Sequence, residues 1–195
     1  VGFAIVFLLT LVLLASVGSL YTVLGRYVSY VAYGDAAKAL AAGSLDEAEA
    51  AIQRSVSFAP SERAYQLAAT SGMARMQRIA GDTSLAPTVA QQQFQAALST
   101  AVNAGLAATQ LGPNDYQNWV VLGSVYQSVS GLGIEGAYDS AKGAYQKAME
   151  LNPTTPILPY VVSQLEIGQG KGAEAETALK ESITLKNDYI PAIIL

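Results

Sequence analysis

The sequence predicts an all-α protein: a solenoid of about four stacked helix pairs, preceded by one long hydrophobic helix. Hydrophobic residues make up 51% of the 195 residues, and much of that share is alanine, which favours helices. The first 25 residues carry no charge. Beyond them, apolar residues recur three and four positions apart, as on one face of a helix, and glycine or proline separates these segments.

The clearest helix pair lies between Tyr116 and Asn152. Its first half has apolar or small residues at positions i, i+3, i+4 and i+7, and its second half repeats a similar spacing. Small residues stand where two helices would cross closely, aromatic residues stand beside them, and a proline stops the second helix. We expect the core of this pair to contain Trp119, Leu122, Gly123, Tyr126, Ala141, Tyr145, Ala148 and Pro153.

This order of large, small and large residues closely resembles a tetratricopeptide repeat (TPR), a helix–turn–helix unit of about 34 residues. The resemblance covers about Tyr33 to Leu195 and includes weaker copies of the same pattern. It implies a TPR-like repeat domain over 33–195, and the apolar composition before it predicts a hydrophobic helix over 1–32, either transmembrane or in the core of an assembly. Within that domain we expect repeats at 33–60, 61–113, 114–153 and 154–187, and the start of a further helix at 188–195.

The segment from Val1 to Gly25 is long enough, at about 1.5 Å per residue, to cross a hydrocarbon core of roughly 30 Å. Arg26 is the first charge, and Tyr21, Tyr27, Tyr30 and Tyr33 cluster around it, as aromatic residues do at a membrane interface. We interpret the segment as a membrane span. A cleaved signal peptide, or a helix buried in an assembly as in pilin-like subunits, remains an alternative.

The same helix is predicted to continue without a breaker to Gly43 and Ser44, which would fuse the hydrophobic segment to the first repeat. Asp46 is expected to begin the next helix. Ser44 would be its N-cap, with Glu47 completing a capping box.

The composition excludes several functions. The chain has no Cys and no His, which rules out disulfides, thiol catalysis and the usual zinc and haem ligands. Its net charge of −4 argues against nucleic acid as a partner. No catalytic constellation is visible, so we predict a protein that is not an enzyme, with no catalytic, cofactor-binding or metal-binding residues and no cofactor.

A TPR array curves, and the first helices of its pairs line the concave side. The resemblance therefore implies a partner groove with a neutral floor, without the Lys/Asn pattern that TPR domains use to clamp a C-terminal carboxylate. The predicted partner is another protein or further copies of this chain. The candidate groove residues are Gln117, Val120, Ser124, Gln127, Tyr160 and Gln164.

The region from Thr83 to Asn114 has no charged residue, although it is rich in Gln, Ser, Thr, Asn and Ala. It is interpreted either as a surface that packs against another subunit, where charges would cost desolvation, or as a polar exported surface. In the second case Ser and Thr side chains could carry O-linked glycan.

These observations lead to two hypotheses about function. The first is a membrane-anchored TPR scaffold for protein–protein interaction in the bacterial cell envelope, with the repeats on the extracytoplasmic side. The envelope assignment is implied by resemblance to repeat tails that follow transmembrane segments in bacterial envelope proteins. The alternative is a self-assembling subunit of an extracellular filament, with hydrophobic helices in the core and repeats outside.

Overall fold

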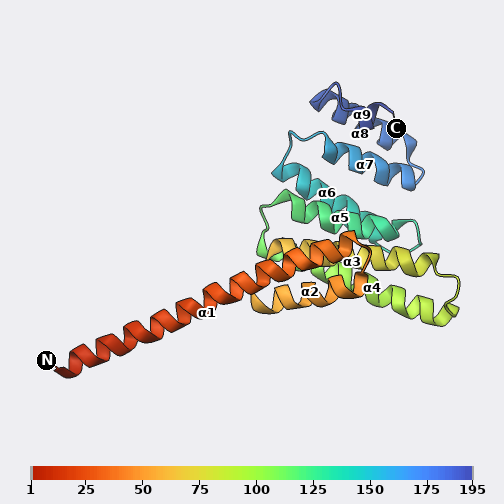
Figure 1. The fold of residues 1–195 in the computed structure, drawn as a ribbon. Coiled ribbons are helices and arrows are strands. Elements are labelled where there is room, and N and C mark those ends of the chain that lie inside the picture. The colour runs from red at the N-terminus through yellow and green to blue at the C-terminus, as the bar shows by residue number, and fades with distance from the viewer. Residues whose placement is uncertain (1, 195) are drawn as a thin grey trace. The chain divides into compact units, whose positions relative to one another are not determined.

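The computed structural model describes residues 2–194. Val1 and Leu195, the outer ends of the predicted apolar segment and of the predicted last helix, lie outside it. All regular elements within residues 2–194 are α-helices (Figure 1). The predicted all-α solenoid with a long N-terminal helix is therefore confirmed. In chain order the helices are α1 (Gly2–Ala41), α2 (Leu45–Phe58), α3 (Glu62–Gly81), α4 (Pro87–Leu111), α5 (Tyr116–Ser130), α6 (Ala137–Leu151), α7 (Ile157–Gly168), α8 (Gly172–Leu185) and α9 (Ile190–Ile193).

The chain divides into two compact units, one ending at Ala64 and one beginning at Tyr65, and each is described by itself. The first unit contains a hairpin in which α2 packs on α1 through mostly small side chains. Ala32 and Ala36 of α1 are buried, as are Ala48 and Ile52 of α2. Small residues at such a contact allow the two helix backbones to approach closely, so the hairpin is thin and tightly paired.

A pair of buried serines joins the far end of this hairpin. The hydroxyl oxygens of Ser29 and Ser55 lie 3.1 Å apart. Ser55 donates to the carbonyl of Ser29 at 3.0 Å, and Ser29 donates to the carbonyl of Ala59 at 3.0 Å. The end of α2 thus lies beside the middle of α1. The residues of α1 before Gly25 extend beyond α2 and are exposed.

The turn of the hairpin differs in one detail from the sequence prediction. Helix α2 begins at Leu45, one residue before the expected Asp46. Ser44 is at the N-cap position, but its side chain makes no capping hydrogen bond, so it does not act as the predicted cap. Its backbone N–H is instead bonded to the carbonyl of Ala39 at 2.9 Å, as part of the closure of α1 around Gly43, whose φ is 78°.

The second unit stacks the remaining helices through close contacts at glycine. A Cβ built on Gly72 of α3 would lie 2.8 Å from the Cβ of Ala101 in α4. Gly123 of α5 faces the ring of Tyr145 in α6 in the same way, with 2.6 Å to the nearest ring carbon. The buried residues around these contacts are largely alanine, whose short side chain suits helices that lie this close, and the larger Tyr145 fits because it faces a glycine.

The last helices are fixed by polar and aromatic contacts. Ser182 of α8 is fully buried and donates to the carbonyl of Pro156 at 2.7 Å, at the start of α7. The ring of Tyr160 meets the edge of Tyr189 with centroids 5.8 Å apart. These contacts hold α8, and the chain that leads into α9, against α7.

Candidate partner-binding surface

Helices α3, α5 and α7 form a continuous row within the second unit. Gln66 of α3 donates to the side-chain oxygen of Asn118 in α5 at 2.6 Å, and α5 in turn contacts α7. Asn118 is fully buried and also donates to the carbonyl of Gly112 at 2.8 Å. These are the first helices of successive pairs, so the predicted groove residues of α5 and α7 belong to neighbouring helices.

Most of the predicted groove residues also take part in contacts inside the fold. The Tyr145 hydroxyl donates to the side-chain oxygen of Gln127 and lies 3.2 Å from the Ser124 hydroxyl. Tyr160 packs on Tyr189, and Gln164 donates to the Tyr160 hydroxyl at 3.0 Å.

Their exposure follows these contacts. Gln117 and Gln164 are exposed, whereas the other predicted groove residues are half-buried. Val120 packs against the buried cluster around Tyr145. Of the predicted groove residues, Gln117 and Gln164 are therefore the most accessible to a partner.

The row also contains an apolar cleft that the sequence analysis missed. It has a volume of about 540 Å³ and opens between α3, α4 and the end of α5. Leu132, which lies in the loop after α5, forms part of its wall and is 62% exposed. No charged residue is part of the lining, which consists of Thr70, Met73, Ala74, Met76, Gln77, Ala80, Phe94, Ser128 and Leu132.

A cleft of this kind fits apolar side chains of a protein partner. Pockets for such groups are mostly apolar and have a few polar atoms that fix orientation, here from Thr70, Gln77 and Ser128. Methionine side chains adapt their shape to different partners. The sequence signal for this cleft was the placement of Met73 and Met76 three residues apart on one helix.

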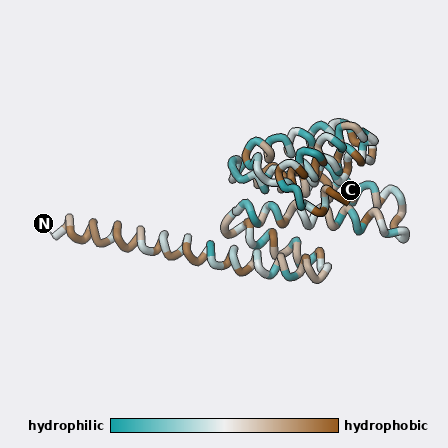
Figure 2. Tube along the Cα trace, turned by 90° about the horizontal axis from the view of Figure 1, so that it is seen from above, coloured by the Kyte–Doolittle hydropathy of each residue, from teal (hydrophilic) through white to brown (hydrophobic). Residues whose placement is uncertain are grey.

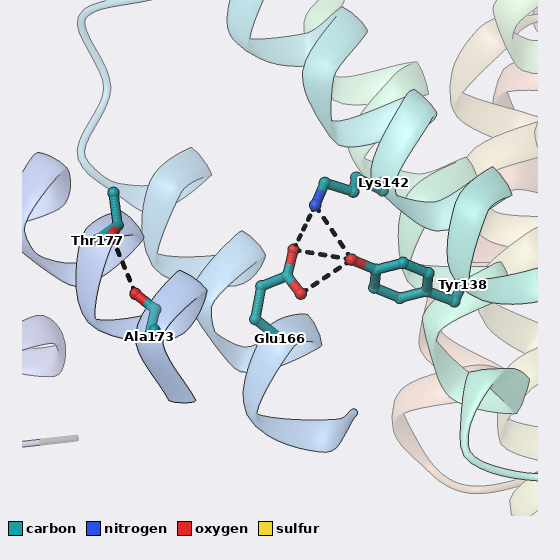
Figure 3. A network of polar contacts seen from close by, with 5 residues as sticks. All are labelled: Tyr138, Lys142, Glu166, Ala173 and Thr177. Atoms are coloured by element: carbon teal, nitrogen blue, oxygen red, sulfur yellow. Dashed lines mark hydrogen bonds and ion pairs between the residues drawn. The ribbon is translucent and has the colours of Figure 1, made fainter. Parts of the chain in front are cut away.

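A charged network around the buried Glu166 joins the third and fourth helix pairs (Figure 3). Glu166 of α7 has only 2% of its side chain exposed and forms an ion pair with Lys142 of α6 at 2.8 Å. The Tyr138 hydroxyl lies 3.0 and 2.9 Å from the two carboxylate oxygens, and it accepts a hydrogen bond from Lys142 at 3.0 Å. Lys171 lies 3.8 Å from the centre of the Tyr138 ring, a cation–π contact.

The electrostatics of this network favour the charged forms. Burial acts to raise the pKa of Glu166, but the hydrogen bonds from Lys142 and Tyr138 outweigh it and lower the pKa below its ordinary value. The hydrogen bonds to Glu166 and Tyr138 raise the pKa of Lys142. Since the carboxylate accepts from Lys142 and Tyr138 and carries its charge at neutral pH, the network stabilises the α6–α7 contact.

The chain is similar in sequence to part of two curated proteins. No family model matches the chain. Human Superkiller complex protein 3 is 33% identical over 87 residues, which are 45% of this chain and 5% of that protein. The mouse protein of the same name is 32% identical over 87 residues. The chain therefore spans about 5% of the length of these relatives.

Solved structures show the fold. A thermophilic TPR protein from Thermus thermophilus superposes with a TM-score of 0.68 at 17% identity, covering 85% of this chain and 78% of that one. The chain has the tetratricopeptide-repeat fold. MamA MSR-1 C2 superposes with a TM-score of 0.54 at 18% identity, covering 82% of this chain and 77% of that one.

Within this TPR fold, the residues predicted for the core of the third pair differ in burial. Gly123 of α5 has no side chain at the point where the Tyr145 ring of α6 packs against it. Trp119 and Tyr126 are half-buried, and the Trp119 indole donates to the carbonyl of Pro113 at 2.9 Å. Pro153 is exposed just beyond the end of α6. The buried members are Leu122, Gly123, Ala141, Tyr145 and Ala148.

Burial also changes the Tyr145 hydroxyl. It raises the pKa of Tyr145 to about 12, against a smaller opposing effect of the hydrogen bond with Ser124. The hydroxyl therefore stays protonated at neutral pH and keeps donating to Gln127. In this repeat the tyrosine is a structural group that links α6 to α5.

Proposed function

We propose that this chain is a membrane-anchored TPR scaffold that holds a partner protein beside a bacterial envelope membrane. One observation carries the proposal: α1 is a single helix of 40 residues that begins as an apolar segment and ends as half of the first helix pair. Of the helices within residues 2–194, it is the one long and apolar enough to cross a membrane. A signal sequence has a similar composition, so the experiment below includes a test for cleavage.

The exposure of α1 supports the anchor. None of its most apolar stretch is buried, and Phe3 and Leu20 are 87% and 59% exposed. Figure 2 shows how the hydrophobic colour dominates the N-terminal part of this helix. Burying apolar surface is the main favourable term in membrane insertion and in protein association alike, so these side chains require a lipid or protein environment.

The dimensions of α1 also fit a bilayer. Residues 2–25 extend over ~36 Å of helix, against a hydrocarbon core of roughly 30 Å. Arg26 follows directly, and the rings of Tyr21, Tyr27 and Tyr30 are all more than half exposed around it. Aromatic and cationic side chains at this position match the membrane–water interface.

For the repeat domain we propose that the 540 Å³ cleft receives apolar side chains of the partner. Gln117 and Gln164 are exposed on the same row of helices and would add polar contacts. We place the repeats on the extracytoplasmic side, in accordance with the resemblance to envelope proteins.

The anchor is tested by expressing the full chain and a truncated chain that begins at Arg26. After alkaline carbonate extraction, the full chain should remain with the membrane, its intact mass should include the apolar segment, and the truncated chain should be soluble. Release of the full chain by carbonate, loss of the segment from the intact mass, or retention of the truncated chain would each contradict the anchor.

The partner site is tested with a photo-crosslinking amino acid at Leu132, in the wall of the cleft, and at Thr177 as a matched control. Thr177 is exposed on α8, where it donates only to Ala173 of its own helix (Figure 3). A discrete crosslinked protein at Leu132 and none at Thr177 is the expected result. Equal crosslinking at both positions would show that the cleft is not selective.

Self-assembly is a second candidate, favoured by the uncharged surface of α4. Residues 83–114 carry no charge, and the exposed side chains of α4 include Gln91, Gln92, Gln93 and Gln95. A neutral face loses less hydration free energy on packing against a copy than a charged face does. Negative-stain electron microscopy of the natively extracted protein separates the two functions: regular fibres support a filament, and discrete detergent-dependent particles support the scaffold.

A further inference from the structure

The first unit contains a small cleft immediately beyond the apolar segment of α1. It has a volume of about 330 Å³ and lies between α1 and the turn that leads from α2 into α3. We propose that this cleft binds the phosphate-bearing headgroup of an anionic phospholipid, an inference that rests on the proposed membrane span. Its walls include Arg26, Tyr30, Tyr33, Ala59, Pro60 and Arg63.

Two arginines supply the positive charge of the cleft. Arg26 and Arg63 are both exposed, and neither has an ion pair or a side-chain hydrogen bond with another residue between 2 and 194. No acidic residue is part of the lining. A guanidinium group presents a planar fork of donors that matches phosphate oxygens, so two unpaired arginines in one cleft favour a phosphate group.

The hydroxyl groups of the cleft add to this chemistry. The Ser61 oxygen accepts a hydrogen bond from the backbone N–H of Ala64 at 3.3 Å, which leaves its own hydrogen available to a ligand. Ser29, by contrast, already donates to the carbonyl of Ala59 and thereby fixes the floor of the cleft. The Ser61 hydroxyl and the two guanidinium groups are therefore donors available to an anionic ligand.

The position of the cleft along α1 selects a lipid rather than a free phosphate ion. Arg26 follows the apolar segment directly, and Tyr33 lies ~10 Å further along the helix axis. If the segment spans the hydrocarbon, the cleft lies at the depth of the headgroups. A phospholipid bound there would place its acyl chains along the exposed apolar side chains before Gly25, a contact that inorganic phosphate lacks.

The test uses the full chain in detergent micelles, where binding can be measured whether or not the chain spans a bilayer. Short-chain phosphatidylglycerol, short-chain phosphatidylcholine and inorganic phosphate are titrated separately, and the side-chain ¹⁵Nε resonances of the arginines are followed by NMR. We expect saturable shifts of Arg26 and Arg63 with phosphatidylglycerol, and at least about tenfold weaker binding of the other two ligands.

Substitution then locates the site. The double variant R26Q/R63Q should lose at least about tenfold in affinity for phosphatidylglycerol, whereas R54Q should bind as the wild type does. Arg54 is a fair control because it is exposed on α2 and does not line the cleft. Since all these side chains are exposed, the variants should unfold at the temperature of the wild type.

Several results would overturn the inference. Equal binding of phosphatidylglycerol and phosphatidylcholine would show no preference for anionic lipid, and equal binding of inorganic phosphate would show a simple anion site. An equal loss in R54Q would show general charge attraction. Carbonate release of the wild-type chain would instead overturn the membrane anchor, whatever the titration shows.

Discussion

Replacing Gly123 with alanine tests how much the close contact between α5 and α6 contributes to stability. The added Cβ would lie 2.6 Å from Cε1 and 2.7 Å from Cδ1 of Tyr145. Carbon atoms pack best at about 3.5–4.0 Å, so the ring or the whole of α6 has to move by ~1 Å. Tyr145 is only 1% exposed, and its hydroxyl is bonded to Gln127, so the ring has little room to turn aside.

The expected size of the effect follows from three contributions. Overpacking of a buried site costs about 1–3 kcal/mol. Distortion of the Tyr145 hydrogen bond adds up to about 1 kcal/mol. The higher helix propensity of alanine returns about 1 kcal/mol. Together these contributions give about 0–3 kcal/mol, and we expect Gly123→Ala to lower the free energy of unfolding by about 1–2 kcal/mol, the middle of that range.

The assay is urea unfolding of the full chain in a mild detergent, followed by the fluorescence of Trp119, the single tryptophan. Gly143→Ala is the matched control, because Gly143 is exposed on α6 and an added Cβ meets nothing within 4 Å. That substitution should raise the free energy of unfolding by about 1 kcal/mol. Unchanged or increased stability of the Gly123 variant would refute the argument from close contact.

Other substitutions test the remaining interfaces. Gly72→Ala should lower the free energy of unfolding by about 2 kcal/mol, measured by urea unfolding. Adding Ala101→Gly to the same chain should restore part of this stability, and a double variant no more stable than Gly72→Ala alone would contradict the close contact. The pKa of Glu166 is lowered in the fold, so its carboxylate adds to the free energy of unfolding at pH values above its ordinary pKa of about 4.3. This added stability is lost as the pH falls through the lower pKa of the folded state. Thermal unfolding between pH 7 and pH 3 should show this loss in the wild type and a flatter profile in Glu166→Gln. Ser55→Ala should lower the stability of the α1–α2 hairpin by about 1 kcal/mol, measured by amide hydrogen exchange. Unchanged protection of its backbone amides would contradict a stabilising contact between Ser29 and Ser55.

Much of the architecture follows from local sequence. Apolar spacing locates each helix, and glycine or proline locates each break, because both depend on residues near in the chain. The spacing predicted both Gly123 and Tyr145 for the core of the third pair, and the structure adds that the two face each other. The start of α2 and the capping role of Ser44 were not predicted correctly from local sequence. The closure of α1 around Gly43 gives Ser44 a ψ of 73°, and its hydroxyl then makes no capping bond.

The candidate site was harder to predict because it depends on residues from different pairs. Glu166 and Lys142 are 24 residues apart, and neither has a local feature that indicates the other. The wall of the apolar cleft combines Met73, Phe94 and Leu132 from separate elements. The resemblance to TPR arrays predicted Gln127 for the partner groove, and nothing in the local sequence indicated that its side chain also accepts a hydrogen bond from Tyr145 on the neighbouring helix.

Because α1 is one unbroken helix, the number of its residues determines a direction in space as well as a length. An α-helix turns by about 100° and rises ~1.5 Å with each residue, so the chain length between Gly25 and Ser29 sets a direction as well as a distance. One residue inserted there would turn the Ser29 face, and α2 with it, by about a quarter of a revolution relative to the apolar segment. Seven residues would return it to within about 20° of the original direction. The direction in which α2 packs on α1, seen along the axis of the proposed membrane segment, is thus determined by the number of residues in a single helix.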